Sequence, residues 1–488
     1  MGFSCKLLYD VMNALIGYTG FVGSHLISSG MEFYNRANLT TIEGNHFGRL
    51  YISALPAEKW KANKDPEQDR ENMTTLMRSL ERVTSDCVIL ISTIDVYEMS
   101  LPQDEFPDLC PNIYATHPYG KHRREFEEWC MRTFKNVFIF RLPALFGHGL
   151  KKNALYDLMT NNQTDKLRGE WLFQWYDMKW LSADIEKHIA KGHHLVNLVT
   201  PPVHLSTIQS VFFPDTPIQM ASETTVRYHF TSLYGYSHSL EDVIQNMTVF
   251  LHSQNSRLLV SELGWDRKDD SVVDCFLRSR GITQHEIVPS KRKWDMVNYK
   301  DVYSAQSLLF GVDIQIFQEQ ERFLQILMTR LGYLSTVGTR VAVFGSPKQR
   351  LYTDEDAVTL FRKVGDIAAT YGILFCIENN ARCYGGNWLT TAKDTAEFVK
   401  QVAHPNIRMN LDIGSLLLEG ETATPDLSVV GHVQVSFPNL GEWQENPLIV
   451  SLLSEWKGPI SLEMCRPARL FESIDRFVQV FSPSQISQ

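Results

Sequence analysis

The sequence predicts two α/β domains in tandem: a doubly wound parallel sheet of the Rossmann type, followed by a (β/α)8 TIM barrel. Three observations predict this. Apolar runs alternate with helical patterns along the 488 residues. A glycine-rich turn follows the first apolar run. The last part of the chain, about 230 residues, holds eight strand candidates, which is the size of a (β/α)8 barrel.

The first half is expected to start with a strand, a glycine turn and a helix, and to continue by alternating strands and helices. The expected strands are 13–16, 50–54, 87–92 and 137–141, and the clearest helical patterns are 69–83 and 119–134. A short polar stretch at 251–256 predicts the domain boundary. We therefore expect one domain over 1–250 and a second over 251–488.

The second half is expected to supply the eight strands of a barrel. They are 257–262, 286–289, 313–318, 340–345, 373–378, 407–412, 432–436 and 459–463, with helical stretches such as 354–371 and 391–402 between them.

Composition argues against several classes of protein. The formal net charge is −9, shared about evenly by the two halves, and no Lys/Arg stripe predicts a nucleic-acid partner. No apolar run predicts a membrane span, and the first residues lack the pattern of a secretory signal. The eight cysteines form no C-x-x-C pair, which favours a reduced, cytoplasmic compartment. The expected partner is a small molecule, and a homodimer is an open alternative.

The motif Gly17-Tyr18-Thr19-Gly20-Phe21-Val22-Gly23 has the spacing of a dinucleotide site. Its glycines allow a tight turn and close backbone approach to a pyrophosphate, which the start of the next helix would bind. Glu43 lies 20 residues further on, where an acid that binds ribose belongs, and its surroundings fit a strand end. A plain glycine turn and a surface glutamate are the alternatives.

Three further motifs follow in order: Ile91-Ser92-Thr93-Ile94-Asp95-Val96-Tyr97, Pro118-Tyr119-Gly120-Lys121-His122-Arg123 and Arg141-Leu142-Pro143-Ala144-Leu145-Phe146-Gly147. With the glycine motif, they make residues 12–250 resemble the extended short-chain dehydrogenase/reductases, the sugar-nucleotide epimerases and dehydratases. The resemblance implies NAD or NADP as cofactor, Thr93 and Tyr119 as catalytic residues, and Asp95 as an acid. Arg123 stands where the family has lysine, so either the chemistry persists or the domain binds a nucleotide without turnover.

Substrate contacts of this first domain are expected downstream. Lys151, Lys152 and Asn153 follow a glycine turn and would suit a phosphate, with a solvated loop as the alternative. Gln174 lies in an aromatic run that forms either a pocket wall or core.

Carboxylates end three strand candidates of the second half: Glu378, Asp412 and Glu463. Polar residues at the carboxyl ends of barrel strands point into the active site. Like charges gathered there need a cation or a proton, so a divalent metal with oxygen ligands is expected. Salt bridges to nearby arginines are the alternative.

These strand ends make residues 256–485 resemble the xylose-isomerase-like sugar phosphate isomerases/epimerases, a superfamily that includes endonuclease IV. The resemblance implies a metal held by Glu378, Asp412, Gln434 and Glu463, where Gln434 replaces a histidine. His432 lies a layer deeper in the barrel and is a candidate substrate contact. Such oxygen ligands favour Mg²⁺ or Mn²⁺, with Zn²⁺ possible. Glu378 and Glu463 would exchange the proton of an enediolate. Lys348 and Arg350 would bind an anionic group, and the weaker pocket candidates are Glu262, Lys291, Gln318, Asn379 and Tyr384.

The leading hypothesis is a carbohydrate-modifying enzyme with two sites, an NAD(P)-dependent domain and a metal-dependent isomerase/epimerase barrel. In the alternative, only the barrel is catalytic and the first domain is a binding module. DNA repair is a third reading, which the balanced acidic charge argues against.

Overall fold

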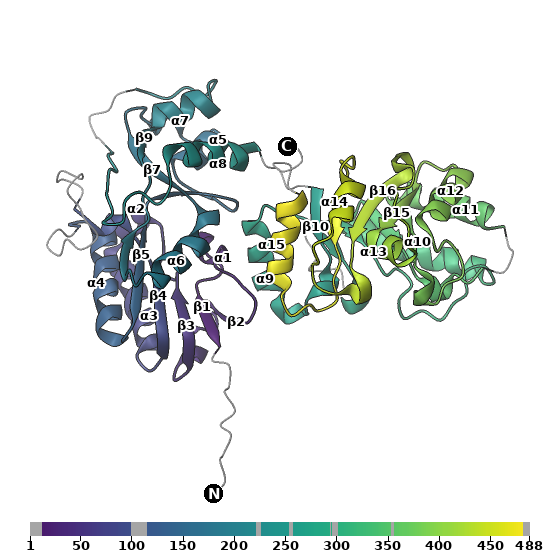
Figure 1. Ribbon diagram of the computed structural model, residues 1–488, viewed down its shortest axis with the longest axis horizontal. Coiled ribbons are helices and arrows are strands. Elements are labelled where there is room, and N and C mark those ends of the chain that lie inside the picture. The colour runs from purple at the N-terminus through teal and green to yellow at the C-terminus, as the bar shows by residue number, and fades with distance from the viewer. Residues whose placement is uncertain are drawn as a thin grey trace, which may run out of the picture. The chain divides into compact units, whose positions relative to one another are not determined.

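The computed structural model describes residues 12–98, 115–220, 226–252, 257–292, 294, 301–352 and 356–481. The chain divides into two compact units. The first comprises Met1–His252 with Ser271–Ser279, and the second Ser253–Asp270 with Arg280–Gln488. Each unit contains one large parallel sheet (Figure 1). The α/β fold class predicted from the sequence is therefore confirmed.

In the described part of the first unit, six parallel strands form a sheet in the order β2-β1-β3-β4-β5-β8. The strands are β1 (Asn13–Ile16), β2 (Met31–Tyr34), β3 (His46–Ile52), β4 (Thr84–Thr93), β5 (Val137–Leu142) and β8 (Leu195–Asn197). Neighbours in this order that are not consecutive in sequence require crossover connections, as in a doubly wound sheet.

Helices cover both faces of this sheet. Alternate strand residues such as Leu50, Val88 and Ile139 form one core with α3 (Pro66–Leu80) and α4 (Pro118–Thr133). The other face carries α6 (Leu181–Ala190), where the His188 ring packs on Phe140, 6.3 Å between centroids. The period of two along each strand thus buries both faces, which is why these strands read as continuous apolar runs.

The helix that follows the glycine motif is very short. Helix α1 spans only Phe21–Ser24, and the chain turns at Gly30, in the left-handed region, into β2. The segment around Glu43 is also different from the expectation. It is a 3₁₀ helix, Leu39–Ile42, and not a strand end. The apolar residue Ile42 is buried because it caps the core beside α3, not because it belongs to a strand.

Smaller elements complete the first unit. They are a sheet of β6 (Ala144–Phe146), β7 (Leu172–Asp177) and β9 (Pro202–His204), with helices α2 (Lys59–Lys64), α5 (Ala154–Thr160), α7 (Leu205–Phe212) and α8 (Leu240–His252). A second core, built around Trp175, joins these pieces.

The second unit is the expected barrel. Among its described residues, eight parallel strands pair in the order β10-β17-β16-β15-β14-β13-β12-β11. They are β10 (Leu258–Val260), β11 (His285–Ile287), β12 (Val302–Ala305), β13 (Val341–Phe344), β14 (Leu374–Glu378), β15 (Ile407–Asp412), β16 (Val430–Val435) and β17 (Ile460–Leu462). A bridge between Ser261 and Glu286 brings the two end strands together and nearly closes the barrel.

Helices separate most of these strands in sequence. They are α9 (Asp270–Ser279), α10 (Gln320–Thr336), α11 (Ala357–Thr370), α12 (Ala392–Val402), α13 (Ile413–Leu418), α14 (Pro447–Leu453) and α15 (Leu470–Phe481). One expected strand, 313–318, is wrong, because the third strand is β12. Ile314, Ile316 and Phe317 are buried in a connection instead of a strand, so the run is apolar for a different reason.

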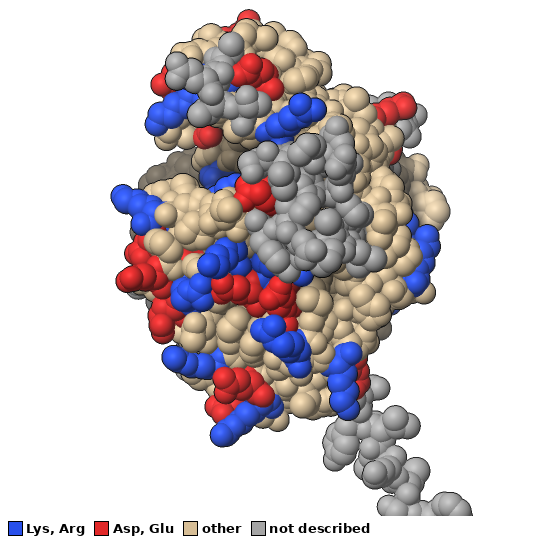
Figure 2. Space-filling view, turned by 90° about the vertical axis from the view of Figure 1, so that its left-hand side faces the viewer, with Lys and Arg blue, Asp and Glu red and all other residues tan. Residues whose placement is uncertain are grey.

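Surface and length features agree with the composition. In the described part of the chain, no helix is both long and apolar enough to cross a bilayer. On the face shown in Figure 2, Lys and Arg side chains are interspersed with Asp and Glu. Any anionic ligand must therefore be bound by local groups rather than by the net field.

Candidate functional site

Three carboxylates end neighbouring strands of the barrel. Glu378 is the last residue of β14, Asp412 the last of β15, and Glu463 follows β17 directly. Asp412 pairs in register with Gln434 on β16, which places an amide beside the acids. Asp412 and Glu463 are buried and Glu378 is partly buried. The parallel strands thus bring these four side chains to one end of the barrel.

Burial and mutual repulsion raise the pKa of all three acids. The pKa of Glu378 rises to about 8 because the group is buried and faces Asp412, with Arg350 acting in the opposite direction. The pKa of Glu463 lies well above its usual value because of burial and the charges of Asp412 and Glu378. Burial also raises the pKa of Asp412, which hydrogen bonds partly offset. Groups that perturb one another in this way share one site.

Local hydrogen bonds fix the acids in place. The Asp412 Oδ1 accepts from Ser415 N at 2.9 Å and from Ser436 Oγ at 2.8 Å. Asn379 bonds to the backbone N and O of Asp412 at 2.9 and 3.0 Å, so it positions the strand end. A Cβ at Gly345 would lie 3.1 Å from both carboxylate oxygens of Glu378, which explains the glycine at this strand end.

A buried polar layer lies around Gln434. Its Oε1 accepts from Asn410 Nδ2 at 2.5 Å, and its Nε2 donates to Glu286 Oε1 at 2.9 Å. His432, two residues earlier on β16, is fully buried and bonds through Nδ1 to Asn410 Oδ1 at 2.8 Å. Burial lowers the pKa of His432 to about 3, so the ring is neutral. His432 therefore lies in the barrel interior, and its Nε2 finds no hydrogen-bond partner among the described residues.

The donor set fits a hard divalent cation by its chemistry. Three carboxylates and one amide oxygen are the ligands that Mg²⁺ and Mn²⁺ prefer. Burial raises the pKa of all three acids, and neighbouring acids raise those of Glu378 and Glu463 further. Within the described ranges, however, no group of three or more His, Cys, Asp or Glu side chains is arranged to hold a metal. The Gln434 oxygen is also engaged with Asn410. Metal binding would need these side chains to reorient.

Cationic and phenolic groups border the acids. Arg350 is fully buried and donates through Nη2 to Glu378 O and to Asn380 Oδ1, both at 2.8 Å. Its Nε and Nη1 find no hydrogen-bond partner within the described chain. Lys348 is exposed nearby. The pKa of Tyr384 rises to about 12 through burial and then the charge of Asp412, which places its phenol close to the acids.

Other predicted pocket residues have structural roles or lie outside. Lys291 donates to the backbone carbonyls of Glu262 at 2.9 Å and Trp265 at 2.8 Å, and Glu262 accepts from Val288 N at 3.1 Å. Gln318 is exposed in the connection before α10.

In the first unit, the glycine motif forms the expected tight turn. Gly17 has a φ of +88°, and a Cβ there would lie 2.2 Å from Ser53 O. A Cβ at Gly23 would lie 2.1 Å from Gly17 O, so the third glycine permits close packing. Thr19 and Gly20 are exposed, and Phe21 and Val22 are partly exposed at the start of α1. A four-residue helix supplies little dipole, so the turn's own N–H groups would have to bind a pyrophosphate.

Glu43, the acid predicted to bind a ribose, does not lie at the edge of the sheet next to the glycine turn. Glu43 is about half exposed and pairs with Arg82 at 3.2 Å. The residues that follow β2 are Asn35 and Arg36, and Glu43 lies beyond the 3₁₀ helix. This position does not suit a ligand of a nucleotide bound at the glycine turn.

The predicted catalytic residues Thr93 and Asp95 lie together, with a lysine that the motifs did not predict. Lys59 Nζ donates to Asp95 Oδ1 at 2.6 Å, and the Tyr228 hydroxyl donates to the same oxygen at 3.0 Å. Thr93 Oγ1 accepts from Asp95 N at 3.1 Å. Tyr119 is buried close by, and burial raises its pKa to about 12, against the lowering effects of Arg123 and the Thr93 hydroxyl.

Arg123 does not replace the family's lysine in geometry. Its guanidinium is stacked on the Tyr119 ring, 4.0 Å from the centroid, and is buried. It pairs with Asp69 and donates to the backbone oxygen of Pro56. His122 also bonds to Asp69, at 2.8 Å. The charge of Arg123 acts to lower the pKa of the Tyr119 phenol, but the hydrogen-bonding groups of Arg123 are used by the fold.

The downstream substrate candidates divide in two. Lys151 and Lys152 are exposed. Partial desolvation of its ammonium group lowers the pKa of Lys152. Asn153 caps α5 by accepting from Tyr156 N and donates to Leu145 O. Gln174 is fully buried, with its amide bonded to the backbone of Thr200 and Phe230. Asn153 and Gln174 therefore serve the fold.

Three residues around these sites were missed from the sequence: Lys59, Tyr228 and Glu286. No motif marks them, because Lys59 and Tyr228 come from segments far from Asp95 in sequence. Glu286 is the first residue of the expected strand 286–289. An acid in an apolar run is the signal that could have marked it.

Comparison with known proteins finds a family match in the barrel. Residues 299–446 match the family model "Xylose isomerase-like TIM barrel". No curated protein sequence is significantly similar to the chain.

Solved structures of both predicted kinds resemble parts of the chain. A UDP-glucuronic acid 4-epimerase mutant from Bacillus cereus has 14% identity, covering 49% of this chain and 99% of its own, with a TM-score of 0.39. The UDP-glucose 4-epimerase of Thermotoga maritima has 12% identity, 45% and 90% coverage and a TM-score of 0.36. The D-psicose 3-epimerase of Clostridium cellulolyticum H10 has 17% identity, 46% and 90% coverage and a TM-score of 0.34.

Identities this low and TM-scores below 0.5 carry no inference about this chain's activity. The family model is the firmer match, and it covers part of the barrel only. Residues 299–446, in the C-terminal half of the chain, are thus similar to a xylose isomerase-like TIM barrel.

Proposed function

We propose that the barrel is a metal-dependent isomerase or epimerase of a small sugar or sugar phosphate, acting by proton transfer through an enediolate. One observation carries this proposal. Three buried or partly buried acids with raised pKa values gather at the carboxyl ends of β14, β15 and β17, where barrel enzymes hold their catalytic groups.

Glu378 and Glu463 are proposed as the proton-transferring pair. A pKa near neutrality suits an acid or base, because both protonation states are then accessible. One carboxylate would remove a proton from the carbon beside the substrate carbonyl. The other would return a proton to the neighbouring carbon, or to the opposite face of the same carbon. A divalent cation held by Glu378, Asp412, Gln434 and Glu463 would supply electrophilic polarisation of the carbonyl.

Substrate binding is proposed for Arg350, Lys348 and Tyr384. The guanidinium of Arg350 keeps two nitrogens without partners among the described residues, while Lys348 adds a second cation. Such groups favour a substrate that carries a phosphate or carboxylate. The Tyr384 phenol, which stays protonated at neutral pH, can donate a hydrogen bond to a hydroxyl or carbonyl oxygen.

Deuterium incorporation tests the proposal. Sugars, sugar phosphates and nucleotide sugars are incubated with the full chain and Mn²⁺ or Mg²⁺ in D₂O, and products are examined by mass spectrometry. We expect deuterium at carbon, abolished by chelator and by Glu463→Gln or Asp412→Asn. Glu455→Gln, an exposed acid of the same unit, should behave as wild type. Chelator-resistant activity with no metal in the purified protein would reject the metal-dependent mechanism.

For the first unit we propose dinucleotide binding at the glycine turn. The turn itself fits a dinucleotide, because Gly17 and Gly23 stand where there is no room for a side chain. NAD or NADP would supply hydride chemistry there, and Lys59, Asp95 and Tyr119 would face the substrate. Calorimetric titration with NAD⁺ and with NADP⁺ tests this. If neither binds, the domain is not a dinucleotide enzyme, and the reading in which only the barrel is catalytic stands.

A further inference from the structure

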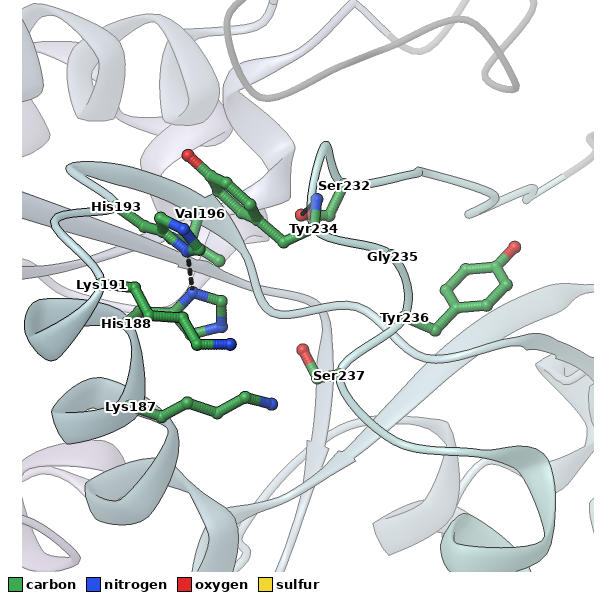
Figure 3. Close-up of a pocket in the computed structure, with 10 residues that line it drawn as sticks. All are labelled: Lys187, His188, Lys191, His193, Val196, Ser232, Tyr234, Gly235, Tyr236 and Ser237. Atoms are coloured by element: carbon green, nitrogen blue, oxygen red, sulfur yellow. Dashed lines mark hydrogen bonds between the residues drawn. The ribbon is translucent and has the colours of Figure 1, made fainter.

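A small cavity in the first unit gathers basic side chains away from both proposed sites. It has a volume of about 100 Å³ and is bordered by the last turn of α6, the start of β8 and the loop 232–237 (Figure 3). Its lining residues are Lys187, His188, Lys191, His193, Val196, Ser232, Tyr234, Gly235, Tyr236 and Ser237.

The lining is positively charged and contains no acid. The side chains of Lys187 and Lys191 extend from the same end of α6 in the same direction, and Figure 3 shows Ser237 on the opposite wall. Neither lysine has an ion-pair partner among the described residues. The acids of α6 are used elsewhere: Asp184 accepts from Tyr176 at 2.7 Å and from His238 at 2.9 Å, and Glu186 pairs with Arg49.

The wall of the cavity is fixed by aromatic and histidine contacts. His188 is buried, and its Nδ1 lies 2.9 Å from Nδ1 of His193 in a hydrogen bond. The His193 ring stacks on Tyr234 with 3.6 Å between centroids. These contacts tie the loop to the start of β8, so the hydroxyls and ammonium groups face one space.

We propose that this cavity binds the phosphate group of a small ligand. Two ammonium groups would neutralise the dianion, and the seryl hydroxyls and imidazole would donate hydrogen bonds to its oxygens. The cavity lies along β8, the last strand in the sheet order, whereas Gly17–Gly23 follows β1. Strands β3, β4 and β5 lie between these two strands. The cavity is therefore separate from the proposed dinucleotide site.

Calorimetric titrations with inorganic phosphate, ribose 5-phosphate and ribose, at constant ionic strength, test this proposal. We expect saturable binding of at least one phosphate compound and none of ribose. Equal affinity for both phosphate compounds assigns free phosphate as the ligand chemistry. Tighter binding of ribose 5-phosphate assigns a phosphate ester, with Tyr234 and Tyr236 beside its organic part.

Variants place the binding in this cavity. Lys187→Gln with Lys191→Gln should weaken binding at least tenfold, and Ser237→Ala should weaken it severalfold. Both lysines are exposed, so the fold should persist, which a thermal melt checks. Lys135→Gln, at an exposed position of the same unit, is the control and should bind as wild type. Absence of saturable phosphate binding, or equal binding by the double variant, overturns the proposal.

Discussion

Lys59 Nζ lies 2.6 Å from Asp95 Oδ1, and this ion pair joins the first turn of α2 to the segment that follows β4. The pair is about a third exposed at the lysine and less at the aspartate. It places a lysine in the predicted catalytic cluster, at a position that the spacing from Tyr119 does not indicate. The cation beside Asp95 is therefore an ammonium from α2, while Arg123 is engaged with Asp69 and Pro56.

A double-mutant cycle with Lys59→Met and Asp95→Asn should give a coupling free energy of about 1 kcal/mol. This is smaller than the coupling of a fully buried ion pair, because both side chains are partly exposed to solvent. The measurement is urea unfolding of the wild type and the three variants at low salt. The cycle of Lys61→Met with Glu58→Gln is the control, because that pair is on the same helix at 2.8 Å but more exposed. Its coupling should be severalfold smaller. Equal couplings in the two cycles would contradict a specific role for the Lys59 contact.

Arg123→Lys should destabilise the first unit by about 2 kcal/mol, although it restores the residue typical of the family. A lysine loses the guanidinium's contact with the Tyr119 ring. It also loses at least one of the three hydrogen-bond partners of Arg123, which are Asp69 and the backbone oxygens of Tyr119 and Pro56. Urea unfolding gives the change, and calorimetry tells whether NAD⁺ binding improves; we expect no improvement. Arg132→Lys on the exposed surface of α4 is the control. A variant as stable as wild type that binds NAD⁺ more tightly would show that Arg123 takes the lysine's role.

In chelator-treated protein, Glu378 should make stability fall as the pH rises. Its folded pKa, about 8, lies above the value of about 4.3 expected in the unfolded chain, so the folded state keeps a proton that the unfolded state has lost. The stabilising contribution is complete below the unfolded pKa and is lost as the pH rises through about 8. The difference between wild type and Glu378→Gln in urea unfolding, measured from pH 4 to 9, reports this group together with its effect on Glu463.

Added Mn²⁺ should reduce that pH dependence, because a bound cation favours the ionised carboxylate. Glu455→Gln should follow wild type throughout. A wild-type protein whose stability does not fall relative to Glu378→Gln would show that the Glu378 carboxyl is not protonated in the folded chain.

Much of the fold follows from periodicity in the sequence. The strands at 13–16 and 407–412 agree with the structure to the residue, because short segments with apolar residues between turn signals are typical of buried parallel strands. The same pattern wrongly predicted the third barrel strand at 313–318. Ile314, Ile316 and Phe317 are buried beneath a connection, and apolarity does not distinguish that from a strand, whereas β12 is only four residues long.

The candidate sites were predictable where chemistry is local to a strand end. Glu378, Asp412 and Glu463 each end an apolar run, and parallel strands bring such ends together. Lys59 and Tyr228 could not be predicted, since only the tertiary fold brings them to Asp95. The prediction for Glu43 rests on its distance from Gly23 in the sequence. Because α1 is very short, β2 ends at Tyr34, well before Glu43.

Glu286→Gln should destabilise the barrel by about 2 kcal/mol, because a neutral amide replaces an acceptor of several buried donors. Glu286 Oε1 accepts from Gln434 Nε2 at 2.9 Å and from Ser461 Oγ at 3.0 Å, and Oε2 accepts from Ser304 Oγ at 3.0 Å. A seryl hydroxyl can rotate to accept from the new amide. The new amide can direct its oxygen to Gln434 and Ser461 and its NH2 to Ser304, so the loss comes from replacing charge-assisted hydrogen bonds by weaker neutral ones.

Urea unfolding compares this variant with Ser304→Ala, which removes one hydrogen bond and should cost about 1 kcal/mol. Because Gln434 is also a proposed metal ligand, Glu286→Gln should weaken Mn²⁺ binding severalfold, measured by calorimetry, while Ser304→Ala should not. If both variants lose equal stability and bind Mn²⁺ as wild type does, Glu286 does not position Gln434, and the buried layer contributes to packing alone.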